Sequence, residues 1–338
     1  MGSWLGLLAD SLLLLVPAEV CRHGVSLPSL RAVARLGASA RSAMAREQQR
    51  LAANVAGPFY VDRSCIDCGT FWQFDPAHFA PTGNTSHVQR QPQGDAETRQ
   101  ALLALQACPV AAIGTSRELL AHTPADGFPA LVDSRPEGEV YYCGWASRKS
   151  FGASSWLIVR RRSDGSANNV LIDVPRWSGA LAWQITGLGG LQRILLSHRD
   201  DVADHAAWAR HFGCERWIHA ADASAAPEAE HQLKGMEPVA LDPDLQLIPT
   251  PGHTPGSLVV LFAGQVLFSG DHLWWGVDPP GVVASRRYCW WNWEEQLRSV
   301  EKLLDLDVRW LLPGHGRRKA FGAGEWRGEL ERTLAGAG

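Results

Sequence analysis

Four short apolar segments are each followed within three residues by a histidine or an aspartate, and this feature constrains the fold more than any other. The segments are residues 194–197, 247–250, 266–269 and 310–312, and the clusters that follow them contain His198, His205, His253, Asp271 and His315. Loops that leave strand ends converge on one edge of a sheet, which suits a preorganised metal site. Imidazole and carboxylate are ligands that divalent zinc, iron and manganese accept. The pattern therefore predicts a metal centre at a sheet edge.

The sequence around these clusters alternates β-rich runs with turn signals, and helical patterns lie between them. Strands are expected at residues 154–160, 169–174, 193–197, 216–220, 246–250, 258–262, 265–269 and 309–312. Helices are expected at residues 202–212, where Gly213 ends the helix, and at residues 293–306. Many strands with interspersed helices predict an α/β fold in which two sheets are faced by helices.

The ordered motifs of this region resemble those of the metallo-β-lactamase superfamily, glyoxalase II among them. They are Ser-His followed by Asp-His within residues 197–205, Pro-Gly-His-Thr-Pro-Gly at 251–256, Ser-Gly-Asp at 269–271 and Pro-Gly-His-Gly at 313–316. The resemblance covers residues 151–318 and implies the αββα four-layer sandwich with two metal sites. It implies that His198 and His253 bind the first metal, that Asp204, His205 and His315 bind the second, and that Asp271 bridges them. Asp173 matches the family's structural aspartate near the site.

The sequence departs from the superfamily pattern in the first cluster. The family has His-x-His-x-Asp-His, whereas here Asp204 lies six residues after His198 and Asp200 holds the position of the second histidine. Either Asp200 is a carboxylate ligand of the first metal, or that metal has two protein ligands. A carboxylate in place of an imidazole shifts the metal preference from zinc toward iron or manganese. Asp201 is a further candidate, as a ligand or as a partner that orients a ligand.

A second group of motifs lies at residues 58–122 and resembles a single-cluster bacterial ferredoxin. Cys65 and Cys68 form a CxxC pair, and Cys108 is followed by Pro109. In that family such thiolates enclose an iron–sulfur cubane. We therefore expect a small α+β ferredoxin-like domain ahead of the sandwich, with a helix over residues 95–107 that has Asp95 as its N-cap.

The cysteine pattern is incomplete, because Phe71 holds the position where the ferredoxin pattern has its third cysteine. Three interpretations follow. A three-iron cluster needs only Cys65, Cys68 and Cys108. A four-iron cluster would take a fourth ligand from Cys143, Asp67 or another molecule. The third interpretation is a module that keeps the fold without a cluster.

The domain organisation follows from these motifs. Residues 1–57 read as an N-terminal extension, residues 58–122 as the cysteine module, residues 123–138 as a linker and residues 140–330 as the sandwich domain. The extension has six arginines, no lysine and only three acidic residues. It fits a secretory signal, an organelle transit peptide, a mis-assigned start for which Met44 is the true first residue, or an ordinary helix. A transit peptide would direct the protein to the plastid stroma; otherwise a cytoplasmic location is expected.

The composition limits the kinds of partner and the cellular environment that we expect for this protein. The net charge is −3 with acids and bases interspersed, so no nucleic-acid-binding surface is expected. No apolar run reaches the roughly 18–20 residues of a membrane span. Seven cysteines with a single CxxC pair argue against a disulfide framework and favour a reducing compartment.

The resemblance implies a hydrolase that acts on a small ester or thioester substrate through a metal-bound hydroxide, with Asp204 as the catalytic residue that orients it. The first alternative is an iron-dependent redox enzyme that receives electrons through the cysteine module from a transfer partner. The second is a scaffold with degenerate sites. Trp274-Trp275 and Trp290–Trp293 flank Asp271, where aromatic side chains line a substrate cleft or pack the second sheet.

Overall fold

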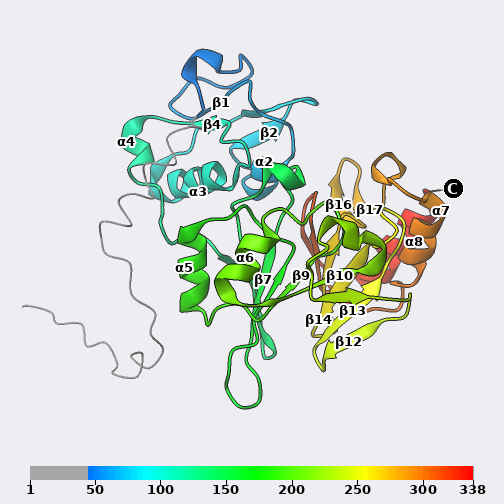
Figure 1. The fold of residues 1–338 in the computed structure, drawn as a ribbon. Helices are drawn as coiled ribbons and strands as arrows, with labels where there is room; N and C mark the ends of the chain where they lie inside the picture. The colour runs from blue at the N-terminus through cyan, green and yellow to red at the C-terminus, as the bar shows by residue number, and fades with distance from the viewer. Residues whose placement is uncertain (1–44, 338) are drawn as a thin grey trace, which may run out of the picture. The chain divides into compact units, whose positions relative to one another are not determined.

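The structure is a computed structural model that describes residues 45–337. Two sheets dominate it (Figure 1). The first has the strand order β11-β10-β9-β8-β7-β6-β5, with β5 (Ala130–Arg135), β6 (Gly138–Tyr142), β7 (Trp156–Val159), β8 (Val170–Ile172), β9 (Arg193–Leu195), β10 (Glu215–His219) and β11 (His231–Leu233). The second has the order β12-β13-β14-β15-β18-β19, with β12 (Val239–Asp242), β13 (Leu245–Pro249), β14 (Leu258–Phe262), β15 (Val266–Gly270), β18 (Trp310–Pro313) and β19 (Lys319–Ala320).

Successive side chains along the strands of the second sheet point to opposite faces, and each face belongs to a separate apolar core. In β14, Val260 and Phe262 belong to the core shared with the first sheet, while Val259 and Leu261 belong to a second core on the opposite face. Helices α5 (Gly179–Gly187) and α6 (His205–Phe212) contribute to the first core, and α7 (Trp293–Glu301) and α8 (Glu325–Ala335) cover the second. The layers therefore run helix, sheet, sheet, helix, which confirms the αββα sandwich (Figure 1).

The cysteine module has its own small core. It contains α2 (Thr70–Phe74), α3 (Gly94–Ala107), α4 (Arg117–Leu120), the β2 (Phe79–Pro81)–β3 (Ser86–Val88) hairpin and the pair β1 (Tyr60–Val61)–β4 (Ile113–Gly114). Arg176 of the sandwich holds this module through hydrogen bonds of 2.7 Å and 2.9 Å to the carbonyls of Gln106 and Cys108. Because these carbonyls lie at the end of α3, the arginine satisfies acceptors that the helix leaves free.

The eight strands and two helices expected in the sandwich are all present, with ends shifted by a few residues. The prediction of a linker at residues 123–138 is wrong, because β5 lies within these residues and pairs with β6 at the edge of the first sheet. The polar Asp133 and Arg135 on this edge strand obscured its pattern. The helix expected at residues 95–107 is α3, but Gln93 takes the N-cap position and Asp95 lies in the first turn.

The boundary placed after residue 57 also needs correction. Residues 45–57 pack on the cysteine module, where Asn54 accepts hydrogen bonds of 3.0 Å from the backbone amides of Val61 and Val88. The alternatives proposed for the N-terminal extension concern residues 1–44, which lie outside the described range. Within residues 45–337, no helix combines the length and apolarity that crossing a bilayer requires.

Candidate metal centre

Strand register brings the polar clusters to one place. β15 and β18 are parallel neighbours with Gly270 opposite Pro313, so Asp271 and His315 leave the same edge of the second sheet. His198 follows β9 of the first sheet, and the two sheets are joined here by a hydrogen bond of 2.9 Å from the Leu258 amide to the Ser197 carbonyl. His253 follows β13. The site thus lies where the edges of the two sheets meet.

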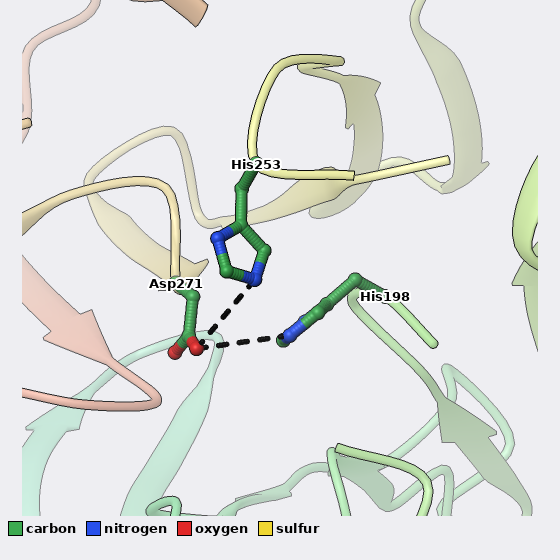
Figure 2. Close-up of side chains that lie close together, drawn as sticks. All are labelled: His198, His253 and Asp271. Atoms are coloured by element: carbon green, nitrogen blue, oxygen red, sulfur yellow. Dashed lines mark ion pairs between the residues drawn. The ribbon is translucent and has the colours of Figure 1, made fainter. Parts of the chain in front are cut away.

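Asp271 belongs to both groups of possible ligand atoms, and Figure 2 shows it facing His198 and His253. Its Oδ2 lies 3.7 Å from Nε2 of His198 and 3.8 Å from Nε2 of His253. Its Oδ1 lies 2.8 Å from Nδ1 of His315. One carboxylate therefore faces histidines on two sides, as a ligand shared by two metals would.

The nearby aspartates complete two groups of ligand atoms. Asp200 Oδ2 lies 3.5 Å from His253 Nε2 and 3.9 Å from His198 Nε2. One atom from each of Asp201, Asp271 and His315 falls within 4.8 Å of the others, and so does one from each of His198, His253 and Asp271. A Cβ on Gly314 would lie 2.8 Å from Asp271 Oδ1 and 2.9 Å from Asp201 Oδ2. Only glycine at position 314 lets the chain pass this close to both carboxylates.

Neighbouring groups orient two of the histidines. Ser197 Oγ donates to Asp173 Oδ2 at 2.8 Å and accepts from His198 Nδ1 at 2.9 Å. His253 Nδ1 donates to the carbonyl of Tyr288 at 2.6 Å. In each ring the proton resides on Nδ1, so the Nε2 lone pair points into the site. Ser197 and the Tyr288 carbonyl were missed by the sequence reasoning, because a hydrogen bond between distant segments leaves no local pattern.

The site contains buried nitrogen and oxygen atoms of the kinds that bind metal ions. Among the described residues, His198 Nε2, His253 Nε2, His315 Nε2 and both carboxylate oxygens of Asp201 are buried without a hydrogen-bond partner. Buried polar atoms rarely remain unpaired, because each costs free energy on leaving water. These atoms are all metal-ligand types, and their residues belong to the two groups of ligand atoms that share Asp271, which matches a site for divalent cations.

The acidic and basic groups of this site shift each other's pKa values. Burial lowers the pKa of His198 to about 4. Burial acts in the same direction on His315, but the Asp271 carboxylate outweighs it and raises the pKa of His315 to about 10. Burial, reinforced by the charge of Asp271, raises the pKa of Asp201 well above its ordinary value. Burial raises the pKa of Asp173 to about 7. Such shifts arise where like charges crowd a buried site that a cation would neutralise.

Asp204 and His205 lie outside the two groups of ligand atoms that share Asp271, unlike the ligand set that the resemblance implies. Asp204 accepts hydrogen bonds of 2.6 Å from Lys149 Nζ and 2.8 Å from the Trp177 amide. His205 is the first residue of α6, with Nδ1 3.4 Å from Arg216 and Nε2 3.9 Å from Glu228. Because the loop after His198 is longer than the family pattern, Asp201 occupies the interior instead.

The three cysteines of the module lie near one another, and Phe71 packs beside them. Burial raises the pKa of Cys108 to about 12, and the neighbouring Cys68 and Cys65 add to the shift. Phe71 is 1% exposed and contacts Phe79 edge-on, with ring centroids 5.3 Å apart. Cys143 lies in the main core of the sandwich, and Asp67 accepts a hydrogen bond of 3.2 Å from Ser86.

Comparison with known proteins agrees with this architecture. Residues 148–315 match the metallo-β-lactamase superfamily, and residues 61–115 match the 4Fe-4S single cluster domain of ferredoxin I. A hydroxyacylglutathione hydrolase of Anaeromyxobacter dehalogenans (strain 2CP-C) is 39% identical over 151 residues, which are 41% of this chain and 56% of that protein. The chain thus matches little more than half the length of this relative.

Two solved structures are similar to this chain at low sequence identity. A metallo-β-lactamase from Erythrobacter litoralis is 19% identical, with 61% of this chain and 95% of that chain covered and a TM-score of 0.45. One from Hirschia baltica is 17% identical, with 61% and 96% covered and a TM-score of 0.45.

Proposed function

Residues 148–315 form a domain of the metallo-β-lactamase superfamily, and from this premise we propose that the protein is a metal-dependent hydrolase of small ester or thioester substrates. The observation that carries the proposal is the set of buried, unpartnered ligand atoms around Asp271. A fold that only served as a scaffold would gain stability by replacing these groups with apolar ones.

We assign the ligands in two groups. His198, His253 and Asp200 would hold the first metal, Asp201 and His315 the second, and Asp271 would be shared. The assignment places three carboxylates among six ligands. Oxygen ligands favour harder cations, so iron and manganese compete with zinc at this site.

Bound divalent metals supply Lewis acidity that polarises a carbonyl and acidifies water. The chain itself supplies the orientation. Both oxygens of Asp201 are buried and lack a hydrogen-bond partner within residues 45–337. We assign to Asp201 the role first expected of Asp204, which is to accept a hydrogen bond from the attacking water and to hold its proton. Asp173 and Ser197 fix the ring of His198, and the Tyr288 carbonyl fixes that of His253. Rigid ligands keep the reacting groups aligned without reorganisation.

The test is hydrolysis of small acyl thioesters by the full chain after loading with Zn²⁺, Fe²⁺ or Mn²⁺ in turn. At least one metal should give turnover, and His253→Ala should remove it. His231→Ala is the matched control, because this histidine contacts Glu215 outside the site. An inactive protein that nevertheless holds its metals would contradict the proposal.

For the cysteine module, we propose a structural role instead of electron transfer. Its residues do not fit a cluster with four thiolates, because the buried ring of Phe71 stands where the pattern has its third cysteine. Apolar contacts of that ring stabilise the module in place of coordination. This observation disfavours the redox alternative, which needs a complete electron-transfer centre.

A further inference from the structure

The segment between β17 (Pro280–Val283) and α7 is tied closely to the loop of His253. Besides accepting a hydrogen bond from the His253 ring through the Tyr288 carbonyl, it donates one of 3.0 Å from the Trp290 amide to the His253 carbonyl. The Asn292 amide donates another of 3.0 Å to the Gly252 carbonyl. Hydrogen bonds with His253 and with its neighbour Gly252 therefore hold this segment beside the metal site.

The same segment exposes large aromatic side chains beside the site. Trp290 is 59% exposed, and its ring centroid lies 6.0 Å from that of His253. Tyr288 is 46% exposed and packs edge-on against Trp290, with centroids 6.4 Å apart. Exposed aromatic rings leave apolar surface in contact with water, and covering that surface releases free energy.

A second exposed ring borders the site at His315. Phe151 is 55% exposed, and its ring centroid lies 6.3 Å from that of His315. Its backbone is left-handed, with φ of 46°, a conformation that a bulky residue adopts at a cost in free energy. A ligand that covers the ring would account for both the strained backbone and the exposure.

We propose that Phe151 and Trp290 bind the apolar, preferably aromatic, acyl group of the substrate. His253 and His315 belong to different groups of ligand atoms that share Asp271. Trp290, beside His253, and Phe151, beside His315, therefore border different parts of the site. An acyl group held between them would keep its carbonyl beside Asp271. Short acyl groups such as acetyl reach neither ring and gain nothing from them. This inference rests on the proposed hydrolytic function and specifies its substrate class.

The test compares acetyl and phenylacetyl thioesters of N-acetylcysteamine with the zinc-loaded full chain. Wild-type protein should prefer phenylacetyl, and Trp290→Ala or Phe151→Asn should reduce the ratio of the two kcat/KM values about tenfold. Asparagine suits the left-handed backbone at position 151. Trp290→Phe should keep most of the preference. Trp183→Ala removes a tryptophan that is 71% exposed on α5 and should leave the ratio unchanged.

Binding of the products separates this inference from the hydrolytic function. Zinc-loaded protein should bind phenylacetate more tightly than acetate in calorimetric titration, and the difference should disappear in Trp290→Ala but not in Trp183→Ala. If neither thioester is cleaved and this binding difference persists, the hydrolytic proposal fails and the aromatic subsite stands. Equal effects of both ring substitutions on acetyl and phenylacetyl compounds, in turnover and in binding, would overturn the inference.

Discussion

The hydroxyl of Thr70 donates a hydrogen bond of 2.7 Å to the backbone carbonyl of Gly152. Thr70 lies two residues after Cys68 in the cysteine module, and Gly152 follows Phe151 at the border of the metal site. A Cβ on Gly152 would lie 2.7 Å from Cys68 Sγ. The cysteine module therefore supports the loop that forms one side of the candidate active site.

Gly152→Ala should disturb this support. The new methyl group would collide with Cys68 and Thr70, in addition to the roughly 1 kcal/mol that a non-glycine residue loses in a left-handed conformation. Gly165→Ala is the control, since Gly165 has a similar φ of +82° against +89° but open space around it. Thermal unfolding and zinc titration should show a larger loss for Gly152→Ala in both quantities. Equal losses would mean that the contact with Cys68 has no influence on the loop.

Ser197→Ala should weaken binding of the first metal. The substitution removes the hydroxyl that links His198 to Asp173, so the ring loses its orientation and a buried carboxylate loses a partner. Loss of such a partner typically lowers metal affinity about 10- to 100-fold. Ser155→Ala is the control, because the Ser155 hydroxyl is buried and has no partner in residues 45–337. Competitive titration with a zinc chelator measures both, and equal affinities would contradict the assigned role of Ser197.

Phe71→Cys should restore a cluster ligand. A thiol at this position completes the ferredoxin pattern with Cys65, Cys68 and Cys108, so iron and sulfide should rise toward about four each per chain with added visible absorption. Phe79→Cys, which alters the ring that Phe71 contacts, should not have this effect. The unmodified protein, purified without air, should lack a full cluster. A complete four-iron cluster in that sample would refute the structural role of Phe71.

Glu230→Gln should reduce the sensitivity of the fold to acid. Hydrogen bonds from Arg216 lower the pKa of Glu230 from 4.5 to about 2. A carboxylate with a depressed pKa stabilises the folded state above its unfolded pKa, and this contribution is lost as pH falls from about 4.5 toward 2. Denaturant unfolding across this range should show a shallower loss of stability in Glu230→Gln than in wild type. Identical slopes would show that the ion pair contributes nothing to folding, as is common for exposed pairs.

Much of the sandwich could be predicted because its strands are buried and apolar, as in Leu258–Phe262. The edge strand β5 could not be predicted, because its partly exposed residues include charged ones, which are typical of a linker. Glycine-bounded motifs placed His253, Asp271 and His315 at strand ends. The loop from residue 198 to residue 205 resisted prediction, because which aspartate turns inward depends on where α6 begins. Trp208 of α6 is buried in the core, and tertiary packing of this kind leaves no local pattern in the sequence.

The role of the aromatic residues near the site could not be predicted from the sequence, for a different reason. The sequence has tryptophans on both sides of Asp271. Packing of the second sheet and binding of a substrate both use such residues, so the residue type alone does not distinguish the two roles. The exposure of Trp290 favours substrate binding.

The most direct test of the central claim is the metal content of three proteins loaded and dialysed in parallel: wild type, Asp201→Asn and Asp204→Asn. The assigned ligands predict about two metal ions per chain in wild type and in Asp204→Asn, and about one in Asp201→Asn, because a site that loses a carboxylate ligand binds its metal weakly. Asp204→Asn changes only a side chain paired with Lys149 and the Trp177 amide. Two ions retained by Asp201→Asn together with loss of one from Asp204→Asn would contradict the assignment.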